Sequence, residues 1–188
     1  MTWLRGTATF SADRAYRYVL TRRWGDGPVM TFIGLNPSTA DADADDPTVR
    51  RLVGFARRAG CGSVCAVNLF ALRATDPRAL RRSPDPVGPD NDGFLRERTQ
   101  VTYVVAAWGA HGNLNGRSAR VRAMLSAIPL LCFGLTANGE PRHPLYVRSD
   151  APLLSLSGSY ALITPARSRT GQSPLRAGAS SPQRLGGP

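Results

Sequence analysis

Residues 31–38 read Thr-Phe-Ile-Gly-Leu-Asn-Pro-Ser, a short apolar run of β type followed by a turn that carries Asn36. A second apolar run, 63–68, also ends on an asparagine, Asn68, and the later segment Arg-His-Pro-Leu contains His143. Polar groups at the ends of buried strands are typical of the ligand site of an open α/β sheet. We therefore expect these three side chains to share one polar pocket.

The order of apolar runs and amphipathic segments predicts an α/β fold. Strands are expected as a hairpin within 7–24 and then at 29–35, 63–68, 101–108 and 130–135, and helices at 47–59, 91–98 and 117–127. Strands that alternate with helices call for right-handed crossovers, which predict a three-layer sandwich with a mainly parallel central sheet. We expect one α/β domain over 1–152 and a disordered tail, rich in Arg, Ser, Pro and Gly, over 153–188.

The expected helix at 47–59 has a clear start. Asp46 is suited to the N-cap position and Pro47 to the first helical position. The face opposite its apolar side carries arginines, which we interpret as a solvated surface rather than a phosphate-binding track. These are Arg50, Arg51, Arg57 and Arg58.

Alternating carboxylates before this helix invite a comparison with calcium-binding loops. They belong to Asp41, Asp43, Asp45 and Asp46. An EF-hand loop that began at Asp41 would need Gly at its sixth position and Glu at its twelfth, where this chain has Asp46 and Leu52. We expect no metal here, since Asp46 caps the helix and Asp45 lies near the positive helix N-terminus.

Charge is the strongest compositional signal. The formal net charge is +11, and all 24 basic residues are arginines. Without lysine, no side chain can form a lysine Schiff base. The excess of positive charge favours a polyanionic partner, nucleic acid first.

Other compositional features limit the class of protein. Three cysteines, Cys61, Cys65 and Cys132, are too few for a disulfide framework or for a four-cysteine iron–sulfur cluster, so we expect buried thiols and no cofactor. No apolar run approaches the roughly 20 residues that span a bilayer, and the N-terminus lacks a secretory h-region. We expect a cytoplasmic monomer without a membrane partner.

The three strand-end groups suit the hydrolysis of an N-glycosidic bond. The Asn36 amide can position a water, and Asn68 offers a donor and an acceptor that complement the imide edge of a pyrimidine. His143 can donate a hydrogen bond to an oxygen that gains negative charge as the base departs. Such chemistry acts on a base flipped out of DNA. The simpler alternative is that both asparagines only form turns and that His143 lies in a surface loop.

Two resemblances support this interpretation. Residues 7–152 resemble a bacterial and phage family that carries a domain of unknown function, with landmarks at 35–41, 46–48, 68–70, 73–77, 88–92, 108–109 and 139–145. More distantly, 34–38, Asn68, 104–109 and 142–145 resemble, in order, the signature segments of the uracil-DNA glycosylase superfamily. The segment after His143 departs from that pattern, because it continues Pro-Leu-Tyr-Val where the superfamily has Pro-Ser.

The superfamily resemblance implies a uracil-DNA-glycosylase-like fold and a monofunctional DNA glycosylase of base excision repair, acting on uracil or a related damaged base. It implies that Asn36 and His143 are catalytic. It further implies base contacts from Asn68, Phe70, Gly34 and Leu35, with Tyr146 as an alternative stacking aromatic, and DNA contacts from Ser38, Thr39, Arg142 and the wedge Leu145. The implied partner is single-stranded or mismatched DNA. A non-catalytic nucleic-acid or modified-base binding module and a nucleoside or nucleotide hydrolase remain the alternatives.

Overall fold

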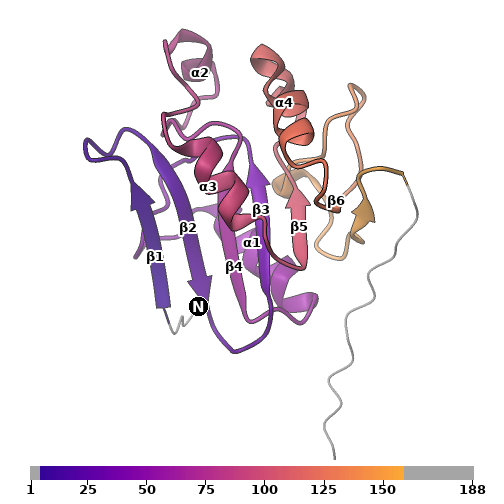
Figure 1. Ribbon diagram of the computed structural model, residues 1–188. Helices are drawn as coiled ribbons and strands as arrows, with labels where there is room; N and C mark the ends of the chain where they lie inside the picture. The colour runs from indigo at the N-terminus through magenta and orange to yellow at the C-terminus, as the bar shows by residue number, and fades with distance from the viewer. Residues whose placement is uncertain (1–4, 159–188) are drawn as a thin grey trace, which may run out of the picture.

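A single seven-stranded sheet with helices on both faces forms the part of the chain that the computed structural model describes, residues 5–158 (Figure 1). Its strands are β1 Arg5–Phe10, β2 Arg17–Arg23, β3 Val29–Gly34, β4 Ser63–Asn68, β5 Tyr103–Ala106, β6 Leu130–Cys132 and β7 Leu154–Ser155. The helices are α1 Pro47–Arg58, α2 Arg78–Arg82, α3 Asn91–Arg98 and α4 Arg117–Met124, with 3-10 segments η1 Ala110–Gly116 and η2 Pro144–Tyr146.

The sheet is mixed, with the strand order β1-β2-β4-β3-β5-β6-β7. Its four central strands, β4, β3, β5 and β6, run parallel, whereas β1–β2, β2–β4 and β6–β7 pair antiparallel. The expectation of a mainly parallel sheet therefore holds for the centre but not for the whole sheet. The hairpin predicted within 7–24 extends the sheet beyond β4, and a short return strand, β7, extends it beyond β6.

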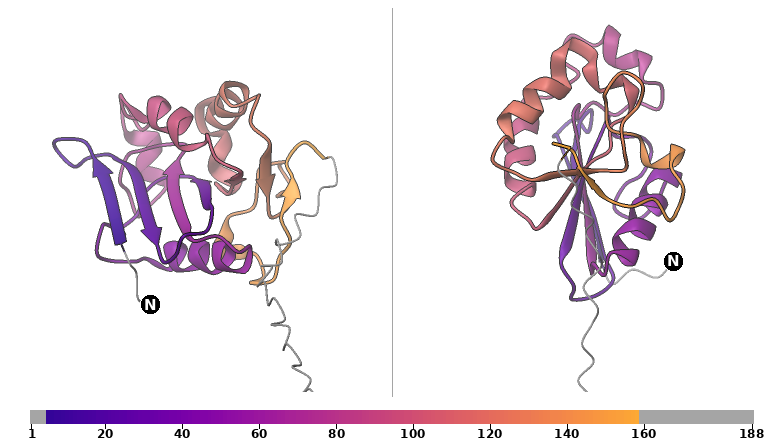
Figure 2. Two further views of the ribbon diagram at one scale, coloured as in Figure 1. Left: turned by 60° about the horizontal axis from the view of Figure 1, so that its bottom comes forward. Right: turned by 90° about the vertical axis from the view of Figure 1, so that its right-hand side faces the viewer.

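Two apolar cores place the sheet in the middle of three layers. On one face α1 packs through Val49, Leu52, Val53, Phe55 and Ala56 against Met30, Phe32 and Val105 of the sheet. On the other face α3 and α4 contribute Leu95 and Val121 to a core with Ile33, Val67 and Val104. Figure 2 shows this division edge-on, with the purple α1 on one side of the sheet and the pink to orange helices on the other.

The order of the parallel strands contains a point where the chain reverses direction across the sheet. From β3 the chain crosses by α1 to β4 on one side, and from β4 it crosses to β5 on the other side of β3. Open α/β sheets bind ligands at such a switch point, outside the carboxyl ends of the strands. The segments that follow β3, β4 and β5 therefore lie where such a sheet places its ligand site.

Helix α1 begins as predicted, because the Asp46 carboxylate accepts a hydrogen bond from the Val49 amide at 2.8 Å. The interpretation of its arginine face as solvated holds for Arg50, Arg57 and Arg58, which are exposed, but not for the half-buried Arg51. Arg51 donates to the carbonyls of Pro144 and Val147, and Arg58 donates to that of Ala151. These side chains tie the segment after His143 to the helix.

Arg22 organises the aspartate-rich loop that precedes α1. This fully buried side chain pairs with the Asp45 carboxylate at 2.8 Å and donates to the carbonyls of Asp41 and Ala44. Asp45 is therefore held by an arginine of β2, a contact that local helix-dipole reasoning did not predict. Within residues 5–158 no group of three or more His, Cys, Asp or Glu side chains is placed to hold a metal ion.

Three further observations bear on the predictions. The cysteines are free and buried, and burial raises the pKa of Cys61 and of Cys65 to about 11. No helix in the described part of the chain is long and apolar enough to cross a membrane. The tail was predicted to start at residue 153, but ordered structure continues beyond that point. Strand β7 pairs with β6, and the Leu156 amide donates to the Leu130 carbonyl. The rest of the predicted tail, 159–188, lies outside the described residues.

Candidate functional site

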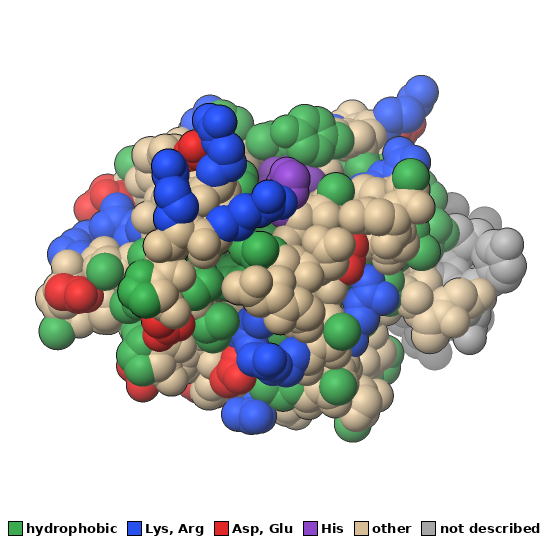
Figure 3. All heavy atoms as spheres, turned by 90° about the horizontal axis from the view of Figure 1, so that it is seen from above, with side chains coloured by type: hydrophobic (Ala, Val, Ile, Leu, Met, Phe, Trp, Pro, Cys, Tyr) green, Lys and Arg blue, Asp and Glu red, His purple; other side chains and the backbone are tan. Residues whose placement is uncertain are grey.

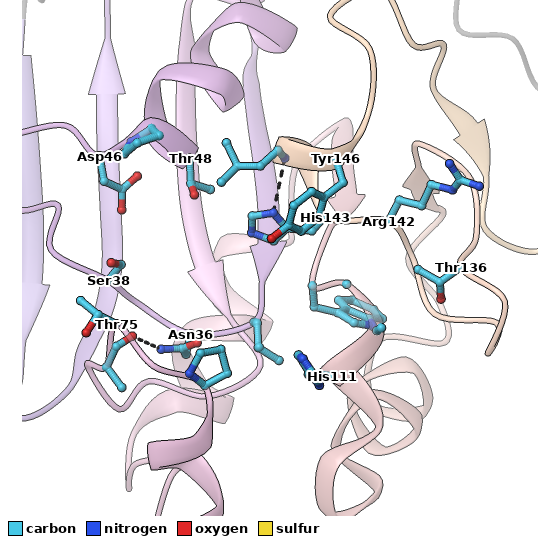
Figure 4. Close-up of a pocket in the computed structure, with 18 of the residues that line it drawn as sticks. Asn36, Ser38, Asp46, Thr48, Thr75, His111, Thr136, Arg142, His143 and Tyr146 are labelled. Carbon is cyan, nitrogen blue, oxygen red and sulfur yellow. Dashed lines mark hydrogen bonds between the residues drawn. The ribbon is translucent and has the colours of Figure 1, made fainter.

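A pocket of about 670 Å³ opens at the carboxyl ends of β3 and β5. Behind it lies a smaller inner cavity of about 60 Å³, and the two spaces share six lining residues: Leu35, Asn36, Ser38, Asp46, Thr48 and His143. Figure 4 shows the walls of the outer pocket. Ser38 and Asp46 lie on one side, His143 lies at the start of η2, and His111 lies below. Seen from above in Figure 3, this face presents a histidine bordered by arginine and apolar side chains.

Asn36 is held rigidly in the turn after β3. Its amide nitrogen donates to the carbonyl of Ala74 at 2.7 Å and to that of Pro37 at 3.0 Å. Because carbonyls only accept hydrogen bonds, these contacts fix the orientation of the side-chain amide. Asn36 can thus offer its Oδ1 as an acceptor to a water or ligand, but it cannot take a proton.

Asn68 lies at the end of β4 and lines the inner cavity. Its side chain is 6% exposed, and its Nδ2 has no hydrogen-bond partner among the described residues. A buried unpaired amide donor costs roughly 1–3 kcal/mol, so this group is suited to a ligand that supplies an acceptor. The backbone around Asn68 is fixed, since buried Asn91 donates to the carbonyls of Asn68 and Leu69 and Arg117 donates to the latter at 2.7 Å.

Gly34 leaves room for this side chain. It pairs with Asn68 across the parallel ladder, and a Cβ at position 34 would lie 2.7 Å from Asn68 Oδ1. Such an approach is shorter than carbon and oxygen tolerate without movement. The absence of a side chain at position 34 is therefore what allows Asn68 to face the cavity.

Gly34→Ala is expected to destabilise the protein by about 1–3 kcal/mol and to displace Asn68, because the added methyl overpacks the end of the ladder. Gly54→Ala is the matched control: it lies on the exposed side of α1, where a Cβ would meet nothing within 4 Å. That control should gain about 0.5–1 kcal/mol. Urea unfolding of both variants checks the pair, and equal stabilities would contradict the assigned role of Gly34.

His143 is half-buried at the start of η2 and lines both spaces. Its Nδ1 accepts a hydrogen bond from the Leu145 amide at 3.3 Å, so a neutral ring carries its proton on Nε2 and can donate from there. Burial lowers the pKa of His143, and the nearby Asp46 carboxylate partly offsets this effect. The site therefore favours a neutral imidazole that acts as a hydrogen-bond donor.

A buried polar network supports the wall that Trp108 forms. The Trp108 indole donates to the Glu140 carboxylate at 2.5 Å, and Ser118 donates to its other oxygen at 2.7 Å. The Arg122 guanidinium pairs with the same carboxylate, with 3.3 Å between Nη2 and Oε2. Next to this wall the Gly109 amide donates to the Pro141 carbonyl, which joins the end of β5 to the segment that carries His143.

The structure brings together most of the residues that the sequence singled out. Asn36, Asn68 and His143 all line the inner cavity, and Gly34 and Leu35 lie beside them. The outer pocket adds four more of the predicted residues: Ser38, Thr39, Arg142 and Leu145.

Phe70 does not contact either space, so its predicted role as a base contact is wrong. It is 1% exposed and belongs to the core beneath α3 and α4, because the chain after β4 turns into that face of the sheet. It cannot stack on a ligand in either space. The aromatic ring at the rim is Tyr146, which is 81% exposed and lies 5.7 Å from the His143 ring.

Three residues that line the two spaces were not predicted from the sequence to do so: Arg17, Asp46 and His111. Arg17, in β2, is 4% exposed and lines the inner cavity, and its burial lowers the pKa to about 10. Both histidines of the chain line the outer pocket. The scarcity of histidine was an available signal for His111, whereas nothing local distinguishes Arg17 from the other arginines.

The fold and pocket define a three-layer α/β protein with a polar site at the carboxyl ends of its parallel strands. Residues 17–145 match the family described as Protein of unknown function (DUF1643), and the chain belongs to that family. This confirms the resemblance to a family that carries a domain of unknown function. Searches of curated proteins and of solved structures found no match.

Proposed function

We propose that this protein is a monofunctional DNA glycosylase that hydrolyses the N-glycosidic bond of uracil or a related damaged base. The observation that carries the proposal is the convergence of Asn36, Asn68 and His143 on one inner cavity from three separate parts of the chain. At the roughly 30 Å³ that a water takes in the liquid, the cavity's 60 Å³ corresponds to about two waters, so a bound base would extend from it into the adjoining pocket of about 670 Å³.

Each of the three groups has a task that its surroundings allow. The unpaired Asn68 amide can read an acceptor on the base, and the fixed Asn36 Oδ1 can hold the attacking water. The Nε2–H of a neutral His143 can donate to the base oxygen on which charge develops. A preorganised donor of this kind contributes about 10²–10³-fold to the rate.

The surroundings of the pocket suit a polyanionic substrate. Arg142 is exposed at the rim, and a groove of about 400 Å³ adjoins the pocket at Pro77 and His111. Arg78 and Arg81 line this groove. Arginines in such a position can contact the phosphates on either side of an extruded nucleotide.

The proposal includes a kinship with the uracil-DNA glycosylase superfamily in fold. Two features support it: the parallel central strands β4-β3-β5-β6, and motif residues placed after β3, β4, β5 and β6 in the order that the resemblance implies. The mixed edges of the sheet differ from the mainly parallel sheet that the resemblance implies, and the antiparallel strand β2 places Arg17 at the inner cavity.

The direct test is release of free base from labelled single-stranded and mismatched oligonucleotides that contain uracil. Wild type should release base, and Asn36→Ala should lower the rate about 10²-fold, because the water loses its position. Asn113→Ala, at an exposed asparagine that lines none of these spaces, is the control. Without lysine, the abasic product should stay uncut until heat or alkali is applied.

Three outcomes discriminate between the candidate functions. Salt-sensitive binding without release would indicate a non-catalytic binding module. Saturable turnover of free deoxyuridine with little effect of DNA would indicate a nucleoside hydrolase. Absence of release across uracil, hypoxanthine and thymine mismatches would contradict the glycosylase proposal.

A further inference from the structure

None of the three predicted residues offers an attacking water a free basic atom. The Asn36 amide is neutral, and its nitrogen is committed to two carbonyls. His143 uses Nδ1 to accept from the Leu145 amide, so its cavity-facing task is donation from Nε2. A neutral water is a weak nucleophile, and its attack is assisted by a base within hydrogen-bond reach.

Asp46 is the one carboxylate among the residues that line the outer pocket and the inner cavity. It is 9% exposed and shares both spaces with Asn36 and His143. One carboxylate oxygen caps α1 through the Val49 amide, and the other takes part in none of the hydrogen bonds found among the described residues. Figure 4 shows the carboxylate on the pocket wall next to Ser38 and Thr48.

Arg17 is a second buried charged side chain that lines the inner cavity together with Asp46. It is 4% exposed, and the Asp46 carboxylate favours its charged form against the cost of burial. Its Nε has no partner among the described residues, as is also true of Asn68 Nδ2. The inner cavity is therefore lined by two buried side chains with unpaired donors, which indicates a ligand with acceptor atoms next to the Asp46 carboxylate.

We propose that Asp46 is the general base of the hydrolysis, an inference that rests on the proposed glycosylase function. The carboxylate takes a proton from the water held by Asn36, and the water oxygen forms a bond to C1′ of the sugar. The bond from C1′ to the base nitrogen breaks, and its electron pair leaves with the base. The base anion, stabilised by His143 and the Arg17 charge, later takes a proton from solvent.

Asp46→Asn separates catalysis from capping, since Asn and Asp cap helices about equally well. It should lower kcat for base release by about 10²–10⁴-fold, the usual contribution of a general base. Asp43→Asn is the control, because Asp43 is exposed in the same loop and lines neither space. The thermal unfolding midpoint and near-ultraviolet circular dichroism verify that each variant is folded.

Asp46→Ser provides a second, independent measurement. Serine also caps the helix, and its smaller side chain leaves space in which added formate can act as the base. Formate should restore turnover of Asp46→Ser but not of Asn36→Ala. Rescue also excludes misfolding as the cause of the loss, because formate does not refold a protein.

The outcomes distinguish this inference from the function on which it rests. If wild type releases base and Asp46→Asn retains turnover within threefold, Asp46 is not the base and the glycosylase proposal stands. If Asp46→Ser loses turnover and formate restores none, Asp46 acts only in the structure. If wild type releases no base from any substrate, both proposals fall.

Discussion

Glu140→Ala is expected to lower the free energy of unfolding by about 3–5 kcal/mol, because it unpairs two buried donors, Trp108 and Ser118, at about 1–3 kcal/mol each. The carboxylate, 7% exposed, accepts from Trp108 at 2.5 Å and from Ser118 at 2.7 Å, and it pairs with Arg122. Alanine would leave the Trp108 and Ser118 donors without their acceptor in the protein interior, whereas Arg122 is partly exposed and keeps the Gly139 carbonyl. Glu140→Gln, which keeps an acceptor oxygen but loses the charge, should cost less.

The measurement is thermal and urea unfolding at constant pH. For a chain of this size, a loss of 3–5 kcal/mol corresponds to a fall in the midpoint of about 6–20 °C. Arg120→Ala, at an exposed position of the same helix α4, is the control and should shift stability by less than about 0.5 kcal/mol. A loss below 1 kcal/mol in Glu140→Ala would show that the network does not hold this part of the fold.

The network also matters for the site. Trp108 lines the outer pocket, and Glu140 lies three residues before His143. Glu140→Gln should therefore weaken the binding of ligands to the pocket even under conditions in which the variant is fully folded. Local loosening of this wall would be seen as faster amide exchange at Gly109, which donates to Pro141.

The sequence allowed the centre of the fold to be predicted because its signals there are local. Asp46 and Pro47 begin α1, and β4 ends at Asn68 as the pattern indicates. The convergence of three polar groups also followed from a general property of open α/β sheets, and it needed only the order of the strands.

The parts that could not be predicted depend on contacts between distant segments. Nothing near β2 shows that Arg17 turns into the cavity, or that Arg51 of α1 holds the carbonyls after His143. Phe70 was misplaced because an aromatic after a strand looks the same whether it faces a pocket or a core. The short strand β7 was missed since its two residues have no periodicity and pair only because β6 has an open edge.

His143→Ala is expected to lower the rate of base release by about 10²–10³-fold under the proposed function, because the donor to the departing base is lost. His111→Ala removes the other histidine of the chain, which is exposed and does not line the inner cavity, and should have a much smaller effect. Wild-type turnover in His143→Ala would show that this side chain does not stabilise the leaving base.

The pH dependence of wild type provides a check on the same residue. Burial lowers the pKa of His143 below its usual value of about 6.5, so the neutral ring persists into mildly acidic solution. The rate should then fall only as the pH drops through this lowered value, where protonation takes the Nδ1 lone pair from the Leu145 amide. A rate that rises over that interval would contradict the assignment of a neutral donor.

The same shift predicts how stability changes with pH. Between the usual value and the lowered one, the unfolded chain binds a proton at this histidine while the folded chain does not. The free energy of unfolding therefore contains a contribution from His143. This contribution is complete above the usual histidine pKa, and it is lost as the pH falls toward the lowered pKa of the folded chain. His143→Gln should remove that part of the slope, as measured by urea unfolding between pH 5 and 8. Because this measurement needs no substrate, it tests the burial of His143 even if the chain acts on a different bond from the one proposed.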